Sequence, residues 1–317
     1  MMTPQEIMTA LDEPYAPYQR EAVEAAVAQQ ETITPLLLQH LEPIASDPQR
    51  WLALEDQGPT LLYTLVLLPH FRETRAHPHV VTLATLPKAL AEPLLGDAIT
   101  ELLPMALWRT SGGDTTSIQE VAKDRNAYGH GRGAAVAALT EAALLGELDV
   151  EATKATLGEW LADDDFAELG DPVWVSLLTN LLSLYATEYV HLLRRRIHEE
   201  YIDPWLVPES EIDSTFNRDR EAVLAEGRKW AKRHFPEDVH SHLASWASFQ
   251  PGFWDEPGGD DGSGGGVFVS QDLPPLFGGV EPAGRLSPKL ASKDPKKKKQ
   301  KRKQQKRDRK ANRKKRK

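Results

Sequence analysis

The chain of 317 residues contains no cysteine. This absence excludes disulfide bonds, catalysis by a thiolate, and zinc or iron–sulfur sites with cysteine ligands. It also agrees with a reducing compartment.

The sequence also lacks segments that would direct it into or across a membrane. The first residues, Met1 to Glu6, have neither the basic start nor the apolar run of a signal peptide. The longest apolar stretch, from Leu61 to Leu68, is far shorter than the roughly 20 residues that a membrane-spanning helix needs. We therefore expect a soluble, cytoplasmic protein.

No segment alternates apolar and polar residues for long, so β-strands are not expected. Helical signals are frequent instead. Thr3, Pro4 and Glu6 supply an N-cap, a proline at N1 and a glutamate at N3, which predict a helix start. Further helices are predicted over 17–30 and 35–45. The apolar spacing of an amphipathic helix then appears in two sets, Ile99, Leu102, Leu103, Ala106, Leu107 and Trp174, Leu177, Leu178, Leu181, Leu182, Tyr185.

These apolar stripes recur every 37 or 38 residues. The positions that keep this interval are Leu62, Ile99, Val136, Trp174, then Leu65, Leu102, Leu139, Leu177, and, in the following helices, Val81, Ile118, Ala155, Leu193. Helix pairs at such a period are typical of HEAT-type solenoids, because one pair alone cannot bury its apolar face. We predict an all-α, HEAT-like α-solenoid over 1–254, with repeat pairs at roughly 60–90, 96–124, 132–162 and 172–202. The alternative is an irregular helical domain whose spacing coincides by chance.

The end of this helical domain is rich in aromatic residues. A last helix is predicted from Glu221 to Phe235, and six aromatic residues lie between Trp230 and Trp254. We expect residues 221–254 to form a cap over the open end of the stack. The alternative is an aromatic docking site that faces solvent.

Beyond Trp254 the composition changes. Residues 255–288 are rich in glycine and proline and predict a flexible linker. Residues 289–317 carry 18 Lys and Arg against two Asp, a net charge of +16, and are predicted to be a disordered polybasic tail. Because the whole chain has a net charge of −9, removing the +16 of the tail leaves −25 for residues 1–288.

The basic tail is the strongest functional signal. Lys and Arg displace the counterions of RNA or DNA, which gives affinity without sequence preference. No aromatic residue interrupts the tail, so stacking on bases is not expected. The predicted polyanion-binding residues are Lys296, Lys297, Lys298, Lys299, Lys301, Arg302, Lys303, Lys306, Arg307, Arg309, Lys310, Arg313, Lys314, Lys315, Arg316 and Lys317. Three alternatives remain: the tail folds back on the acidic body, rests on anionic lipid, or only aids solubility.

Candidate catalytic and metal-binding groups are weak. Two groups of histidines, His70, His77, His79 and His234, His240, His242, are interpreted as surface or interhelix residues. The glycine-rich segment from Tyr128 to Gly133 matches no nucleotide-binding fingerprint and predicts the turn at a helix start. Asp163 to Asp165 predict a solvated acidic loop. We find no catalytic constellation and expect neither an enzyme nor a cofactor.

Residues 34–206 resemble a bacterial family known as domain of unknown function 1186. The likeness is carried by Thr34 to Leu37, Phe71 to Ala76, Leu95 to Glu101 with Leu103-Pro104, and Gly112 to Asp114. The resemblance implies a HEAT-like helical fold and no established activity. Relatives often end in a cysteine-rich zinc motif similar to that of the bacterial preprotein translocation ATPase. Here a polybasic tail stands in its place, which leaves open a similar recruiting role.

Within the resembling segments, Arg72, Glu73 and Arg75 are candidate contact residues. We expect Arg72 and Arg75 to pair with Glu73, Glu101 or Asp97 and to fix the angle between repeats. The alternative is an arginine pair that faces a ligand.

These patterns favour a non-enzymatic protein-interaction or scaffold module. The helical body is expected to bind an unidentified protein partner, and the tail to bind RNA, the ribosome or another polyanion. Two alternatives are a HEAT-repeat enzyme similar to bilin lyases, which needs a tetrapyrrole pocket, and a regulatory subunit autoinhibited by its own tail.

Overall fold

The computed structural model describes residues 2–54, 58–244 and 246–249. The predicted linker and polybasic tail lie outside these residues, as do Phe253 and Trp254. Every regular element in the described ranges is a helix, and none is a strand, which confirms the all-α prediction. No helix in these ranges combines the length and the apolar content that crossing a bilayer requires.

The described helices follow one another with short connections. Their bounds are α1 Pro4–Leu11, α2 Arg20–Ala28, α3 Gln30–Ser46, α4 Pro48–Leu52, α5 Thr60–His70, η1 Thr74–Ala76, α6 His77–Ala84, α7 Lys88–Leu95, α8 Ala98–Glu101, α9 Leu103–Thr110, α10 Thr116–Lys123, α11 Gly129–Leu144, α12 Val150–Ala162, α13 Pro172–Ser183, η2 Thr187–Tyr189, α14 Val190–His198, α15 Glu209–Phe216, α16 Arg220–His234, α17 Val239–Leu243 and η3 Ala247–Phe249.

The predicted start of the first helix is confirmed. Thr3 is the N-cap of α1, and its side chain and that of Glu6 form a capping box. The helix predicted from Pro35 begins earlier, at Gln30, because Pro35 lies inside α3 rather than at its first turn.

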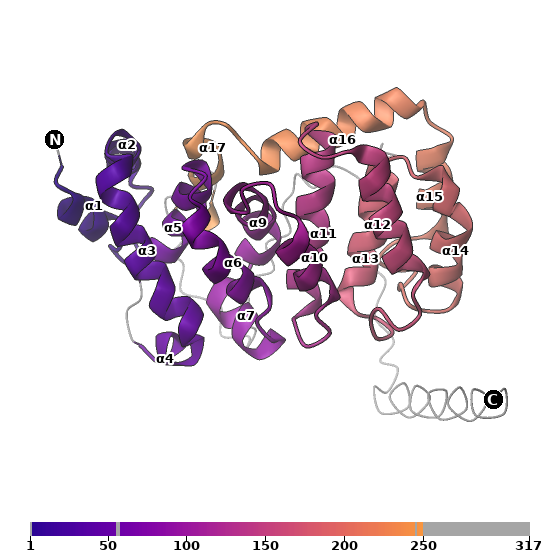
Figure 1. Cartoon of the computed structure of the whole chain (residues 1–317), viewed down its shortest axis with the longest axis horizontal. Coiled ribbons are helices and arrows are strands. Elements are labelled where there is room, and N and C mark those ends of the chain that lie inside the picture. Colours follow the sequence, from indigo (N-terminus) through magenta and orange to yellow (C-terminus); the bar gives the residue numbers. More distant parts are fainter. Residues whose placement is uncertain (1, 55–57, 245, 250–317) are drawn as a thin grey trace, which may run out of the picture. The chain divides into compact units, whose positions relative to one another are not determined.

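Helices pack in chain order in two neighbouring rows (Figure 1). In one row α5, α9, α11 and α13 each contact the next. In the other row α10 lies against α6 and α11, and α12 lies against α13 and α14. The predicted repeat segments 132–162 and 172–202 are therefore each occupied by a pair of helices, α11 with α12 and α13 with α14. The assignment to the HEAT class stays a prediction.

Helix α11 lies at the centre of this packing. It contacts α6, α8, α9, α10, α12, α13 and α16, and 14 of its 16 residues are buried, so it has no solvent-facing side. Glycines let its neighbours approach closely. A Cβ added to Gly131 would lie 2.2 Å from the carbonyl oxygen of Ala84, and one added to Gly133 would lie 2.3 Å from Oγ of Ser176. The backbone of α11 is therefore in close contact with both α6 and α13.

The described part of the C-terminal aromatic segment lies against the side of the stack. We call the segment that runs from α16 through α17 to η3 the strap, and it includes Phe235 and Pro236, which connect α16 to α17. The strap contacts α11 and α13 through α16 and then α5 through α17, so it runs back along the helices toward the N-terminal part (Figure 1). Phe249 packs against Tyr63 and Tyr18, with ring centroids 5.1 and 5.9 Å apart. In the described part of the chain α16 lies along the side of the stack, where Gly227 lets it approach Leu144. The cap predicted over 221–254 extends beyond the described residues and stays a prediction.

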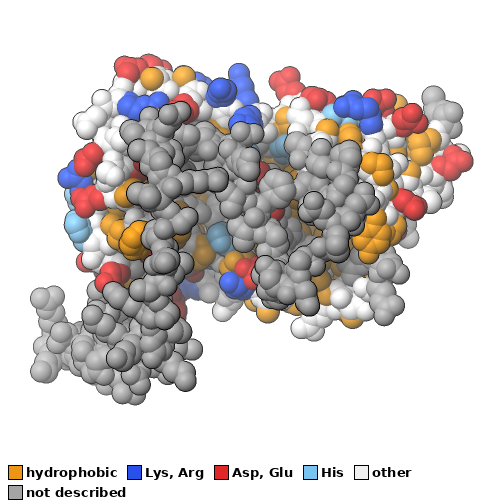
Figure 2. Space-filling view, turned by 180° about the vertical axis from the view of Figure 1, so that it is seen from behind, with side chains coloured by type: hydrophobic (Ala, Val, Ile, Leu, Met, Phe, Trp, Pro, Cys, Tyr) orange, Lys and Arg blue, Asp and Glu red, His pale blue; other side chains and the backbone are white. Residues whose placement is uncertain are grey.

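Charged groups of both signs cover the surface. Figure 2 shows acidic, basic and hydrophobic side chains interspersed on the visible described part of one face. Charge of both signs on a surface makes it suited to selective rather than generic contacts.

We predict that Gly131→Ala and Gly133→Ala respond differently to a second substitution. Each single change should lower the free energy of unfolding by about 1–3 kcal/mol through overpacking, although alanine gains about 1 kcal/mol in helix propensity. Ser176→Ala removes the hydroxyl that a Cβ at Gly133 meets, so it should recover part of the loss in Gly133→Ala. It should not rescue Gly131→Ala, whose Cβ meets a backbone carbonyl. Urea unfolding of the three single variants and the two double variants with Ser176→Ala provides the test, and equal rescue of both would contradict the packing described.

Candidate functional site

A cavity of about 410 Å³ lies where α5, α9 and α11 end. Its lining residues come from the turn after α5, the end of α9 with the following turn, and the turn after α11. They are Arg72, Trp108, Arg109, Gly112, Gly113 and Glu147. We call this cavity the arginine pocket.

The way the helices end places these residues together. Arg72, Gly112 and Gly146 adopt left-handed conformations, with φ of 53°, 66° and 81°. After α5 the N–H of Glu73 donates to the carbonyl of Leu68, and after α11 the N–H of Glu147 donates to that of Ala142. These are the hydrogen bonds of a Schellman cap. A left-handed residue other than glycine costs roughly 1–2 kcal/mol, so Arg72 is held there by its surroundings.

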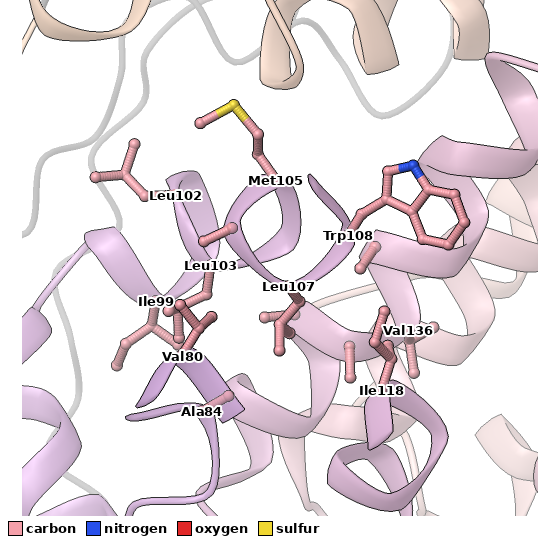
Figure 3. Packing of buried hydrophobic residues seen from close by; sticks show 14 of the residues in the cluster. Val80, Ala84, Ile99, Leu102, Leu103, Met105, Leu107, Trp108, Ile118 and Val136 are labelled. Carbon is pink, nitrogen blue, oxygen red and sulfur yellow. The ribbon is translucent and has the colours of Figure 1, made fainter. Parts of the chain in front are cut away.

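Glu147 is already engaged in the pocket. The indole N–H of Trp108 donates to its carboxylate, and Nη2 of Arg72 lies 3.7 Å from its Oε1. Figure 3 shows Trp108 and Met105 on one side of α9 and Leu107 on the other, toward Ile118 and Val136. The side of α9 that carries Trp108 therefore borders the pocket, while Trp108 itself is buried in the hydrophobic core.

Arg109 is the half-buried cation of the pocket. Its Nη2 donates to the carbonyls of Phe235 and Pro236 in the strap, both at 2.9 Å, and its Nη1 approaches Sδ of Met105 at 3.5 Å. Among the described residues no carboxylate lies within 4.0 Å of its guanidinium. Burial, and then the charge of Arg72, lower the pKa of Arg109.

A second charged contact joins the strap to the core nearby. Nδ1 of His234 on α16 lies 2.7 Å from Oε1 of Glu141 on α11, and Glu141 is only 3 % exposed. Burial raises the pKa of Glu141. Burial alone would lower the pKa of His234, but the charge of Glu141 and the hydrogen bond to it outweigh burial and raise that pKa. Oε2 of Glu141 has no hydrogen-bond partner in the described part of the chain.

The six histidines were predicted to be surface or interhelix residues, and four of them make hydrogen bonds between elements. His77 bonds to the hydroxyls of Thr110 and Ser117 at 2.9 and 2.6 Å, and His240 bonds to that of Tyr18 at 2.6 Å. His234 is the third, and Nε2 of His242 on α17, 3.2 Å from the carbonyl oxygen of Arg233 on α16, is the fourth. No group of three or more His, Asp or Glu side chains in the described ranges is arranged to hold a metal ion.

The three predicted contact residues, Arg72, Glu73 and Arg75, do not share one set of partners in the structure. Arg75 pairs with Glu73 at 2.7 Å, as expected, but this pair lies within one turn and so does not link repeats. The expected partners of Arg72 were wrong: it lies against Glu147, which follows α11. The left-handed backbone at Arg72 turns the chain at the end of α5 and accounts for this difference.

Other predicted segments also have defined roles. The predicted helix start is confirmed, but α11 begins already at Gly129, so Gly129 to Gly133 lie within the helix rather than in a turn before it. Arg132 within that segment is 1 % exposed and donates to the carbonyls of Ala122 and Phe166, each at 2.9 Å. In the predicted acidic loop, Asp164 is exposed but lies 2.8 Å from Nη1 of Arg196. Its carboxylate therefore forms an ion pair with Arg196 as well as contacting solvent.

Comparisons with known proteins identify the family. Residues 2–250 match the family described as protein of unknown function (DUF1186). The chain belongs to this family. It is 27 % identical over 200 residues to an uncharacterised protein of Chlamydia trachomatis serovar D, covering 63 % of this chain and 78 % of that one. An uncharacterised protein of Chlamydia muridarum shows the same identity, with 63 % and 79 % covered. No solved structure matches the chain.

The arginine pocket joins two segments that carry the family resemblance. Arg72 belongs to the first and Gly112-Gly113 to the second, although 40 residues separate them in sequence. Trp108, Arg109 and Glu147 were not predicted from the sequence. Their signal was limited to one charged residue near the end of the apolar helix α9 and a glutamate that follows the turn glycine Gly146.

We predict that Glu141→Gln changes how stability depends on pH. With its folded-state pKa above the ordinary 6.5, His234 stabilises the fold at low pH, and this contribution is lost as pH rises through the raised pKa. The raised pKa of Glu141 acts in the same direction. Without the carboxylate, burial alone would lower the folded-state pKa of His234. Protonation of His234 would then destabilise the fold, so stability would be lost as pH falls instead.

Urea unfolding between about pH 5.5 and about pH 8.5 measures this effect. The free energy of unfolding of wild type should exceed that of Glu141→Gln by about 1.5–3 kcal/mol at the acidic end of this range. The difference should shrink toward the alkaline end. The matched control is Glu101→Gln, because Glu101 also acts on His234 but is exposed. Parallel curves for wild type and Glu141→Gln would show that the pair does not titrate as described.

Proposed function

We propose that this family member is a non-enzymatic binding module. Its helical body docks on a protein partner, and its polybasic tail binds RNA, the ribosome or another polyanion. The two parts meet different partners, because the net charge is −25 over residues 1–288 and +16 over residues 289–317. This charge division is the observation that carries the proposal.

An exposed apolar patch supports docking of the body on a protein. Trp205 is 96 % exposed and Leu206 is 65 % exposed, in the connection between α14 and α15. Leu169 is also exposed, and the N–H of its neighbour Gly170 donates to the carbonyl of Tyr201, so the two loops lie side by side. Tryptophan is enriched among the residues that dominate binding energy at protein interfaces. Asp203 beside Trp205 adds negative charge, which favours a basic partner.

The described cavities favour a binding module over the bilin-lyase alternative. A tetrapyrrole site requires a deep apolar cavity with a few converging polar groups. In the arginine pocket three of the six lining residues are charged, and a second cavity of about 370 Å³ mixes Glu24, Glu237 and Asp238 with two histidines and three apolar residues. Charged linings of this kind suit contacts with a polar or charged partner.

We predict that Trp205→Ser removes partner capture without changing stability. An exposed substitution should alter the free energy of unfolding by no more than about 0.5 kcal/mol. Tagged full-length protein would be used to capture partners from its own bacterium, with nuclease present to remove complexes held by nucleic acid. Leu54→Ser is the matched control, since Leu54 is 52 % exposed elsewhere on the body. Equal capture by wild type and Trp205→Ser would contradict docking through the patch.

The tail is tested with single-stranded RNA and four substitutions in the full-length protein. If about half of the 16 net charges engage, the logarithm of affinity should fall with the logarithm of salt with a slope of about −5 to −6. On the same basis, changing Lys314, Lys315, Arg316 and Lys317 to Gln removes about two engaged charges and should reduce the magnitude of this slope by about 1.4. The matched control changes Arg20, Lys88, Lys229 and Lys232, four exposed cations of the body, to Gln. Fluorescence anisotropy over a salt series measures both slopes.

The same salt series tests the autoinhibited alternative, which the charge division also favours. A tail held by the acidic body would be freed by moderate salt, so RNA affinity would first rise and then fall. A free tail gives affinity that falls throughout. No dependence on the tail substitutions would reject both forms of the proposal.

A further inference from the structure

We propose that the arginine pocket binds a small oxyanion, a carboxylate or a phosphate, between the guanidinium groups of Arg72 and Arg109. This site is separate from the polyanion-binding tail and from the Trp205 patch. It uses different residues, so its test and theirs can fail independently.

The charges of the pocket leave room for one more negative charge. Its lining carries two cations, Arg72 and Arg109, and one anion, Glu147. Glu147 is shared by Arg72 and by the indole N–H of Trp108. Arg109 has no carboxylate within ion-pair distance in the described part of the chain. At longer range only the charges of Glu147 and Glu237 raise the pKa of Arg109 against the effect of burial. A half-buried cation without a direct ion-pair partner is costly, so an anion that binds beside it regains free energy.

The guanidinium of Arg109 is fixed with donors to spare. The strap carbonyls of Phe235 and Pro236 take both hydrogens of Nη2. Nη1 meets only the sulfur of Met105, which is a weak acceptor, at 3.5 Å. A planar guanidinium held along one edge presents its remaining N–H groups in a geometry that matches the oxygens of a carboxylate or a phosphate.

The remaining lining residues leave space for such a group. Gly113 has no atom within 4 Å of the position where a Cβ would lie, and Gly112 is 3.4 Å from a methyl group of Thr74 at the same position. The cavity of about 410 Å³ exceeds what a single phosphate or carboxylate requires, so the oxyanion can be part of a larger molecule.

The principal alternative is that Arg109 serves only to hold the strap through the two carbonyls. In that case Arg109→Gln would lower stability by the same amount whatever anion is present. An anion-binding Arg109 instead couples stability to anion concentration, because a ligand that binds only the folded protein raises its unfolding temperature.

The test measures the unfolding temperature of full-length protein in inorganic phosphate, in acetate and in chloride at equal ionic strength. Wild type should gain stability in phosphate, in acetate or in both, relative to chloride, and the anion that stabilises more identifies the ligand class. Arg109→Gln should weaken the derived anion affinity by at least about tenfold, since a hydrogen bond to a charged group is lost. Arg72→Gln should weaken it less, because Arg72 is more exposed.

Two further variants sharpen the result. Glu147→Gln removes the competing carboxylate and should therefore strengthen anion binding, the opposite sign from the arginine variants. Arg75→Gln is the matched control, because Arg75 is an exposed arginine three residues from Arg72 that pairs with Glu73 and does not line the pocket. Equal anion responses in wild type and Arg109→Gln, or no response of wild type beyond chloride, would overturn the proposal.

Discussion

Helix α11 has to be buried on every side, and much of the described structure follows from that requirement. A helix surrounded by neighbours cannot carry bulky residues all round, because helix axes in contact lie only about 8–10 Å apart. Its sequence from Gly129 to Leu144 is accordingly composed largely of glycine, alanine and a few larger apolar residues. The glycines face α6 and α13, so the spacing of the two rows of helices is set by backbone contact there.

Burial on every side also constrains the polar residues of α11. Arg132 and Glu141 are the only charged side chains that its buried positions include, and each is matched by groups from other elements. Arg132 reaches the carbonyls that end α10 and precede α13, and Glu141 meets His234 of the strap. A buried charge that loses its partner is strongly destabilising. These two residues therefore fix which neighbouring segments can close around the central helix, and in particular hold the strap in place.

How far the sequence predicts this structure depends on the range of each interaction. The capping box at Thr3 and the stripes from Ile99 and Trp174 are local patterns. The helices predicted at Thr3 and from Trp174 are present, whereas the stripe from Ile99 is divided between α8 and α9, because Pro104 lies in the first turn of α9. The glycines of α11 were interpreted only as a turn, because the partners that make them necessary are 40 residues away or more. The path of the strap depends on side-chain fit between α16 and helices far earlier in the chain. The partner of Arg72 depends on a left-handed residue, and no local rule places an arginine there.

The arginine pocket shows how a cation can be kept half-buried without a carboxylate. Helices α5, α9 and α11 all end beside it, and the C-terminal end of a helix carries a partial negative charge. The strap adds the carbonyl dipoles of Phe235 and Pro236 directly on Arg109. Partial charges of this kind offset part of the cost of burying the guanidinium, each helix end contributing about 0.3–1 kcal/mol. Each of these contributions is smaller than that of a hydrogen bond to a carboxylate, which is worth about 1.5–3 kcal/mol. The fold is therefore stable with Arg109 in place while the guanidinium keeps a net attraction for an anion, which is the condition that a reversible binding site requires.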